Sequence, residues 1–381
     1  MKKVLITATV MSHICQFHKV LADMLHKNGY EVHVAAKDNL HTKEGLTLDF
    51  ADKVFNVPFS RSPKSSDNIK AYKMLKEIIK ENDYDIIHCN TPVGGVVTRL
   101  AAKKTRAKII YTAHGFHFYK GAPIPNWVIY YPIEKIMSKY TDMLITINED
   151  DYQISKDRFN AKSYAKIPGV GIDFKRVEDG SNRETVRKEM GFSEDDFVLL
   201  SVGELNKNKN NITILKAIKK LNNPKIKYMM AGNGPLKDWL EEEIEKMGLS
   251  NQVRFLGYTR EIGKLHKASD AFCFASIREG LGLAAIEAMH SGLPIITSDV
   301  RGINDYSIEG VTGFKSQPLD ENGFALAIEK LMKDSALREK MGKNNIEASI
   351  MYGEENVAQT LEKIYLEVDD KNADIHHYSR I

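Results

Sequence analysis

The chain of 381 residues has few cysteines, little net charge and no long apolar run, and each shortage excludes a class of protein. Its three cysteines, Cys15, Cys89 and Cys273, lie in apolar surroundings without a C-x-x-C or metal-like spacing. A disulfide-bonded framework is therefore excluded, and we expect reduced core thiols in a cytoplasmic protein. Lys and Arg outnumber Asp and Glu by 54 − 51 = 3, too small an excess to indicate nucleic-acid binding.

No apolar span is long enough, at about 18 residues, to predict a helix that crosses a membrane. The apolar start at Val4–Thr7 is soon interrupted by His13, so it indicates a first strand and not a signal peptide. No G-x-G-x-x-G motif follows this strand, which argues against a hydride-transferring oxidoreductase. We expect a protein that is cytoplasmic or peripheral at the cytoplasmic face of a membrane.

What the chain does contain is an alternation of short apolar strands with helix patterns, in two halves. This alternation predicts an α/β fold with two doubly wound parallel sheets. Strands are expected at 4–7, 32–36, 86–89, 108–112, 143–147, 197–202, 228–232, 253–257, 270–275 and 295–298, and helices at 13–28, 67–81, 283–289 and 354–367. A hinge at Pro168–Asp173 separates a first domain, 1–170, from a second, 171–353, and a polar tail follows at 369–381.

Two glutamates, Glu279 and Glu287, stand eight residues apart where a strand turns into a helix. Gly280 and Gly282 form the turn, so Glu279 is expected in the loop and Glu287 about one turn inside the helix. The free N–H groups of such a turn can hold a phosphate, and carboxylates on either side can accept hydrogen bonds from sugar hydroxyls. The arrangement suits a sugar nucleotide, although glutamates near helix starts and Gly-x-Gly turns are also common for structural reasons.

Longer motifs around these residues resemble the family 4 glycosyltransferases. The matching segments are 279–287, 291–294, 310–314, 201–210 and 111–117, and the resemblance runs from about residue 1 to residue 366. It implies a retaining enzyme with the GT-B fold, in which two Rossmann-like domains face each other across a cleft. It also implies that a C-terminal helix at 354–368 crosses back to the first domain. The residues of Thr112–Pro123 resemble those of the bacterial branch whose enzymes assemble capsule and exopolysaccharide.

The resemblance implies a set of donor-binding residues in the second domain. Lys209 would contact the diphosphate, Glu287 the ribose hydroxyls and Glu279 a hydroxyl of the transferred sugar. The backbone of Leu281, Gly282 and Leu283 would bind the distal phosphate, and Gly203 matches the start of the phosphate loop.

Two positions depart from the family pattern. Glu204 stands where relatives have an arginine, and Asn210 where they have a glycine. A carboxylate cannot take over the arginine's contact with phosphate. Two roles stay open for Glu204, namely contact with a sugar hydroxyl or an ion pair with Lys207 or Arg301.

On the first domain, the resemblance implies that His114 contacts the donor sugar. His117, Asn90, Thr91 and Gly94 are candidates for the acceptor side, as is His13. The loop expected at 8–13 lacks the Gly-Gly pair that many relatives carry there, so the approach of His13 to the ligands is open.

No metal or other cofactor is expected. Asp83 and Asp85 form an Asp-x-Asp pair directly before a strand, where aspartates are ordinary turn residues. The segment 116–140 mixes aromatic residues with lysines, which is typical either of a bilayer interface or of a well-packed helix. An interfacial segment would fit an acceptor carried on a polyprenyl diphosphate.

The sequence thus predicts a metal-independent, retaining glycosyltransferase. We expect a UDP-sugar as donor and a glycan or a polyprenyl-diphosphate-linked sugar as acceptor, with no nucleic-acid partner. Two alternatives stay open: a sugar-nucleotide epimerase of the same fold, and a non-catalytic subunit that binds a nucleotide sugar.

Overall fold

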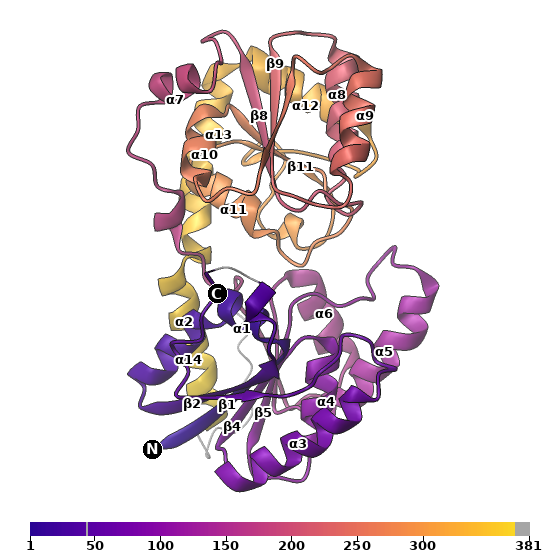
Figure 1. Cartoon of the computed structure of the whole chain (residues 1–381), viewed down its shortest axis with the longest axis vertical. Coiled ribbons are helices and arrows are strands. Elements are labelled where there is room, and N and C mark those ends of the chain that lie inside the picture. Colours follow the sequence, from indigo (N-terminus) through magenta and orange to yellow (C-terminus); the bar gives the residue numbers. More distant parts are fainter. Residues whose placement is uncertain (43–44, 370–381) are drawn as a thin grey trace. The chain divides into compact units, whose positions relative to one another are not determined.

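The computed structural model describes residues 1–42 and 45–369, and the chain divides into two compact units. Unit 1 is Met1–Gly171 with Glu354–Ile381, and unit 2 is Ile172–Gly353. Each unit is a parallel sheet with helices on both faces (Figure 1). The predicted fold class of two Rossmann-like domains is confirmed. Of the predicted polar tail, residues 370–381 lie outside the described residues.

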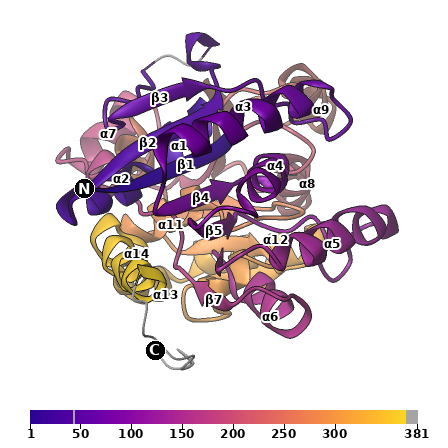
Figure 2. The same ribbon diagram turned by 90° about the horizontal axis from the view of Figure 1, so that it is seen from below.

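Unit 1 contains a seven-stranded sheet in the order β3-β2-β1-β4-β5-β6-β7. Its strands are β1 (Lys2–Val10), β2 (Tyr30–Lys37), β3 (Lys53–Asn56), β4 (Ile86–Asn90), β5 (Lys108–Ala113), β6 (Met143–Thr146) and β7 (Ser163–Lys166). Its helices are α1 (Met11–Phe17), α2 (Lys19–Lys27), η1 (Leu40–Thr42), α3 (Asp67–Asn82), α4 (Pro92–Ala102), α5 (Ile124–Ser138), α6 (Glu149–Arg158) and α14 (Glu354–Asp369). Helices α2 and α14 pack together on one face of the sheet, and α3 and α4 on the other (Figure 2).

Unit 2 contains a six-stranded parallel sheet in the order β10-β9-β8-β11-β12-β13. Its strands are β8 (Phe197–Val202), β9 (Ile226–Ala231), β10 (Val253–Gly257), β11 (Ala271–Phe274), β12 (Ile295–Ser298) and β13 (Gly313–Ser316). Its helices are η2 (Phe174–Val177), α7 (Arg183–Glu189), α8 (Asn211–Leu221), α9 (Lys237–Met247), α10 (Ile262–Ala268), α11 (Leu283–His290), η3 (Ile303–Asp305), α12 (Glu321–Lys333), α13 (Ser335–Ser349) and η4 (Ile350–Tyr352).

The central strands carry continuous apolar runs because helices cover both faces of each sheet. Val4, Leu5 and Ile6 of β1 are fully buried, as are Leu199 and Leu200 of β8. This continuous burial is what made the central strands visible in the sequence. The expected passage of the C-terminal helix to the first domain is seen as well, because α14 packs against α2 within unit 1.

The prediction of one helix at 13–28 is wrong. His18 leaves the helical region with ψ of 9°, and the segment forms two helices, α1 and α2, on either side of it. The loop expected at 8–13 is also absent, because β1 extends to Val10 and α1 begins at once with Met11. Cys15, on α1, is half-exposed and is therefore not the core thiol that we expected, whereas Cys89 and Cys273 are buried.

Asp83 and Asp85 occupy the turn that enters β4, as the sequence indicated. Asp83 ends α3 in the left-handed conformation and pairs with Arg106, which is exposed. Asp85 accepts a hydrogen bond from the backbone N–H of Lys3 at 2.8 Å. Both carboxylates therefore have structural partners at the base of the sheet.

The aromatic residues of the segment 116–140 are mostly packed inward. Phe116 and Phe118 are buried and stack with a distance of 4.8 Å between ring centres. The outer face of α5 is aliphatic instead, with Ile124 78%, Val128 67% and Ile136 53% exposed. None of the described helices is long and apolar enough to cross a membrane.

Candidate functional site

In unit 2, the loops that follow β8 and β11 meet at one edge of the sheet. The two strands are parallel neighbours, so their carboxyl ends lie side by side. The N–H of Ile277 donates to the Asn208 carbonyl at 2.8 Å, and Asn208 Nδ2 donates to the Arg278 carbonyl at 3.0 Å. The predicted phosphate loop and the loop that carries Glu279 therefore form one continuous polar surface.

Lys209 and Glu279 are the charged pair at the centre of this surface. Lys209 Nζ lies 2.6 Å from Glu279 Oε1 and 4.4 Å from the centre of the Phe274 ring. The two side chains are only 23% and 13% exposed, so the pair is held in a partly desolvated place. The sequence singled out both residues but not their ion pair or the aromatic ring beneath the lysine.

The conformation and hydrogen bonds of Asn210 show why an asparagine can stand where the family pattern has a glycine. Its φ is 54°, in the left-handed region that asparagine tolerates better than most residues. Its Nδ2 donates to the carbonyls of Ala275 at 3.0 Å and Pro318 at 2.6 Å. The side chain thus keeps the backbone conformation and also ties the phosphate loop to two neighbouring loops.

The start of α11 offers free backbone N–H groups beside this pair. Gly282 precedes the helix with φ of 92°, and a Cβ there would come within 2.6 Å of the Phe274 ring. A side chain at Gly282 is therefore excluded by both conformation and space. Leu281 is buried, and Leu283 is the first helical residue. On the facing loop, Gly203 follows β8 with φ of 151°.

Glu287 lies on the second turn of α11 and is buried. Arg176, from η2, places an amino group 3.1 Å from its carboxylate. Burial raises the pKa of Glu287, while Arg176 acts in the opposite direction. Arg176 was not predicted from the sequence, because it lies more than a hundred residues before Glu287 in the chain.

Glu204 is exposed, and its Oε2 accepts a hydrogen bond from Asn206 Nδ2 at 2.8 Å. The partner that the structure gives it is therefore Asn206, and neither Lys207 nor Arg301 is needed to hold it. The carboxylate lies on the loop surface, outside the Lys209–Glu279 pair.

In unit 1, the ends of β1, β4 and β5 bring a second group of predicted residues together. His114 follows β5, and its Nε2 lies 3.1 Å from Oδ1 of Asn90, the last residue of β4. The ring of His13, on α1, is 4.7 Å from that of His114. Burial lowers the pKa of His114 to about 4, so its imidazole is neutral at pH 7.

Thr91 and Gly94 form the turn into α4. Thr91 has φ of 64°, which is unusual for a β-branched residue, and its Oγ1 lies 2.8 Å from Thr9 Oγ1. A Cβ on Gly94 would come within 2.7 Å of Thr91 Oγ1, so this glycine allows the close approach of α4 to β1. Asn90 and Gly94 are buried, which makes them supports of the site and not exposed contacts.

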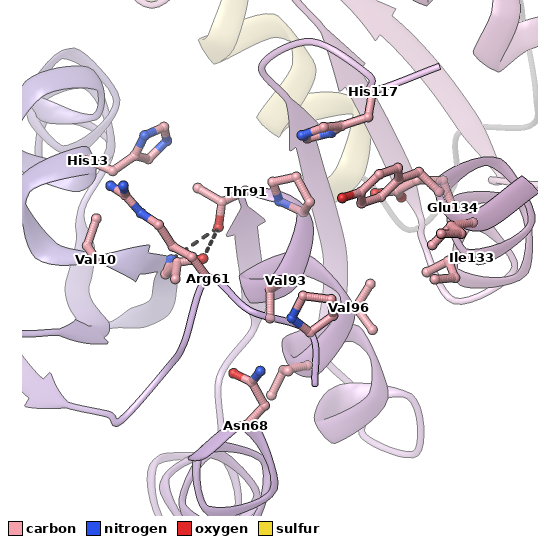
Figure 3. A pocket seen from close by; sticks show the side chains of 16 residues that line it. Val10, His13, Arg61, Asn68, Thr91, Val93, Val96, His117, Ile133 and Glu134 are labelled. Atoms are coloured by element: carbon pink, nitrogen blue, oxygen red, sulfur yellow. Dashed lines mark hydrogen bonds between the residues drawn. The ribbon is translucent and has the colours of Figure 1, made fainter. Parts of the chain in front are cut away.

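A cavity of about 420 Å³ opens beside these residues (Figure 3). Most of its wall is apolar, and His13, Arg61 and His117 bring nitrogen atoms to it (Figure 3). The lining residues are Thr9, Val10, His13, Arg61, Pro63, Asn68, Thr91, Pro92, Val93, Val96, Val97, His117, Ile129, Tyr130, Ile133 and Glu134. Ile129 is also exposed on the outer face of α5, so the cavity wall continues into that aliphatic face.

The position of α5 is fixed by a buried ion pair. Arg99 of α4 lies 2.8 Å from the carboxylate of Glu134 on α5, and the Tyr111 hydroxyl donates to the same carboxylate at 3.0 Å. Because Glu134 holds one face of α5 against α4, the opposite face with its aliphatic side chains points outward.

The comparison with known proteins defines the class. Residues 3–148 match the family described as glycosyl transferase 4-like, and residues 182–348 match glycosyl transferases group 1. A putative glycosyltransferase of Bacillus subtilis, EpsD, is 38% identical over 98% of this chain and 100% of its own length. The chain therefore belongs to the group 1, family 4-like glycosyltransferases, and its two Rossmann-like domains are those of the GT-B fold.

Other relatives agree on the branch of the family. A capsular polysaccharide biosynthesis glycosyltransferase, CapM of Staphylococcus aureus, is 26% identical over 84% of this chain and 86% of its own. A UDP-Gal:α-D-GlcNAc-diphosphoundecaprenol α-1,3-galactosyltransferase of Escherichia coli is 28% identical over 78% and 81%. The chain belongs to the capsule and exopolysaccharide branch.

A solved structure supports the fold. Sucrose-phosphate synthase from Thermosynechococcus elongatus has the same fold, with a TM-score of 0.80 at 18% identity over 97% of this chain and 99% of that one.

Proposed function

We propose that the protein transfers a hexose from a UDP-sugar to a sugar carried on a polyprenyl diphosphate, with retention of anomeric configuration and without a metal ion. The observation that carries this proposal is the Lys209–Glu279 pair beside the free N–H groups that begin α11, with Glu287 buried one turn further on. A cation, backbone donors and two carboxylates are the groups that a nucleoside diphosphate sugar requires.

The leaving diphosphate gains negative charge as the sugar bond breaks. Lys209 and the N–H groups of Leu281, Gly282 and Leu283 would stabilise that charge, the role that a divalent metal fills in other transferases. When Lys209 turns to the diphosphate, Glu279 is released from the ion pair and becomes free to accept a hydrogen bond from the transferred sugar. We assign Glu279 to positioning and electrostatics, and His114 to contact with the same sugar.

Glu287 would accept the two ribose hydroxyls, because one carboxylate can accept from two neighbouring O–H groups. Its pairing with Arg176 opposes the rise in the pKa of this carboxyl that burial causes. The choice of UDP draws on the relative that uses UDP-Gal.

The acceptor side of the proposal draws on the cavity and α5 in unit 1. An apolar wall that continues into an exposed aliphatic helix face suits the isoprenoid part of a lipid-linked sugar, and Arg61 suits its diphosphate. Lys120, Lys135 and Lys139 are exposed near that face and would favour anionic headgroups. We therefore propose peripheral seating of α5 on the cytoplasmic leaflet.

The sequence left two alternatives open, an epimerase and a non-catalytic subunit. The family comparisons name transferases and give no support to an epimerase. The non-catalytic alternative has Glu204 in place of the family arginine as its support, and the transfer assay below tests it.

The test is a transfer assay with purified protein in EDTA. UDP-, GDP- and ADP-sugars are offered with a short polyprenyl-diphosphate sugar, or with the same glycan without its lipid, and NMR identifies the anomeric configuration of the product. We expect release of UDP that needs the lipid-linked acceptor and a product that keeps the donor's configuration. Inversion, a strict metal requirement, or equal transfer to the lipid-free glycan would each contradict the corresponding part of the proposal.

A further inference from the structure

Three histidines of unit 1 converge on one point at the carboxyl edge of the sheet. His13 lies on α1, His18 at the break between α1 and α2, and His114 in the loop after β5. One ring nitrogen of each lies within 4.8 Å of the other two. Their ring centres are 4.7 Å apart for His13 and His114, 5.4 Å for His13 and His18, and 5.6 Å for His18 and His114.

The hydrogen bonds around the cluster leave lone pairs without donors. Among the described residues, the Nε2 atoms of His13 and His18 are buried and have no hydrogen-bond partner. Buried polar atoms of this kind are rare in native structures because each costs about 1–3 kcal/mol. Packing of the three rings alone does not explain why two histidines of one cluster each bury such an atom.

His114 is held in the tautomer that a metal ligand needs. Asn90 Nδ2 donates to the Thr7 carbonyl at 3.3 Å, which orients the amide so that its Oδ1 faces His114. The Nε2–H of His114 therefore donates to Asn90, and its Nδ1 keeps a free lone pair. Histidine ligands of metals commonly donate their second ring nitrogen to such a partner. Burial also lowers the pKa of His13 and of His18, so all three imidazoles are neutral at pH 7.

We propose that His13, His18 and His114 bind one divalent ion of the zinc class, with a fourth coordination position left for water. Imidazole nitrogens select Zn²⁺, Co²⁺, Ni²⁺ or Cu²⁺, whereas Mg²⁺ and Ca²⁺ require oxygen ligands, which this cluster does not offer. Zn–N bonds of about 2.0–2.1 Å place ligand nitrogens roughly 3.4 Å apart, so the rings must rotate inward as the ion binds. Arg61 acts against the ion, because its charge is felt at His13.

The site has a consequence for catalysis that is separate from its existence. The proposed function assigns His114 to contact with the transferred sugar. A His114 side chain that coordinates an ion could not make that contact. Zinc should therefore inhibit transfer, and chelation should restore it. Metal binding itself does not depend on the proposed function and can be measured without any substrate.

The experiment titrates the full-length, chelator-stripped protein with Co²⁺, whose visible d–d bands report four-coordinate geometry, and then displaces the ion with Zn²⁺. We expect one Co²⁺ per chain. His13→Ala, His18→Ala and His114→Ala should each weaken binding about 100-fold or more, and Asn90→Ala about tenfold. Arg61→Ala should tighten binding, because it removes an opposing charge.

Two controls make the result decisive. His26→Ala removes a histidine of the same unit whose Nε2 is 2.9 Å from Asp52, away from the cluster, and should bind Co²⁺ like the unaltered chain. His376→Ala/His377→Ala removes a histidine pair near the C-terminus, outside the described residues, and should also leave the stoichiometry unchanged. Circular dichroism checks that each variant is folded. If the variant of the buried His18 does not fold, His13→Ala still tests the site, because His13 lies on a partly exposed helix. Absence of the d–d bands at micromolar Co²⁺, or bands that disappear only with the C-terminal pair, would overturn the proposal.

Discussion

The two candidate sites of this protein differ in the charge of their polar groups. In unit 2, the polar groups are ions that hold one another, Lys209 with Glu279 and Arg176 with Glu287. In unit 1, neutral imidazoles such as that of His114 lie beside a mostly apolar cavity, with Arg61 as a cation in its wall. This difference supports the proposed division of ligands, with a multiply charged one in unit 2 and one with a large apolar part in unit 1.

Internal ion pairs also indicate how a charged ligand enters unit 2. Each pair gives a cation to a largely buried carboxylate, which would be costly to bury alone. In the proposed function, a nucleoside diphosphate sugar would replace these pairings, with its phosphates contacting Lys209 and its hydroxyls contacting the carboxylates. The same pairs predict that removing one partner changes the behaviour of the other, and the following changes test this.

The largest effect is expected from Glu279→Gln. The amide keeps the shape but loses the charge that positions the transferred sugar, so kcat should fall about 100-fold or more. Binding of UDP alone should change little, because Lys209 remains and is released from its partner. Steady-state kinetics and calorimetry separate the two quantities. Glu261→Gln, an exposed glutamate paired with Lys264, is the matched control; a loss of UDP affinity equal to the loss of kcat would contradict the assigned role.

A smaller effect, about tenfold in Kd for UDP or about 1.4 kcal/mol, is expected from Glu287→Ala. Arg176→Ala tests the pairing, since it leaves Glu287 buried without its cation and should raise the carboxyl pKa further. UDP affinity in that variant should therefore fall as the pH is lowered from 7 to 6, more than it does in the unaltered protein. Equal pH profiles for the two proteins would show that Arg176 does not hold the charge on Glu287.

In unit 1, the aliphatic face of α5 is tested by Val128→Asp. A charge at the centre of that face should reduce sedimentation with anionic lipid vesicles about tenfold, because a buried aliphatic side chain contributes about 1.5–3 kcal/mol. Leu326→Asp is the matched control, since Leu326 is similarly exposed but lies on α12 of unit 2. If the unaltered protein does not sediment with vesicles, or both variants lose binding equally, α5 is not the membrane-facing surface.

The smallest effect is expected from a histidine that belongs to neither site. Burial lowers the pKa of His266 on α10 to about 3, with a further lowering by Arg176. The unfolded chain takes up this proton near pH 6.5 and the folded chain does not, so the free energy of unfolding falls as the pH drops below about 6.5. This residue should account for about 1 kcal/mol between pH 7 and 5.5. Denaturant unfolding of His266→Gln should show a correspondingly shallower dependence; an unchanged slope would contradict the burial of a neutral imidazole.

The sequence predicted the parts of the fold in which burial is continuous. The strands at 197–202 and 295–298 have the predicted bounds, because their residues are buried almost throughout and end at polar turns. The strand at 253–257 also has the predicted bounds, although only Val253 in it is buried. The edge strands β3 and β7 were missed, since each is four residues long and largely accessible. The break at His18 was missed because nothing in the local pattern of apolar residues interrupts the helix there.

The candidate site was predicted where one loop carries its own signal. Glu279, Gly282 and Glu287 lie in a single segment with a recognisable turn. Arg176 and His18 could not be predicted in the same way, because their roles arise from contacts with residues distant in the chain or from a change of helix direction. The change from glycine to Asn210 was visible in the sequence, but its compensation by two side-chain hydrogen bonds was not.

The most direct test of the donor site is calorimetric binding of UDP, GDP and ADP in EDTA to the unaltered protein, Lys209→Ala and Lys207→Ala. Lys207 lies on the same loop but is exposed, so it controls for a general loss of positive charge. We predict micromolar binding of UDP that Lys209→Ala weakens about tenfold to 100-fold, and that Lys207→Ala changes less than threefold. Equal losses in both variants, or no nucleotide binding by the unaltered protein, would contradict the donor site in unit 2.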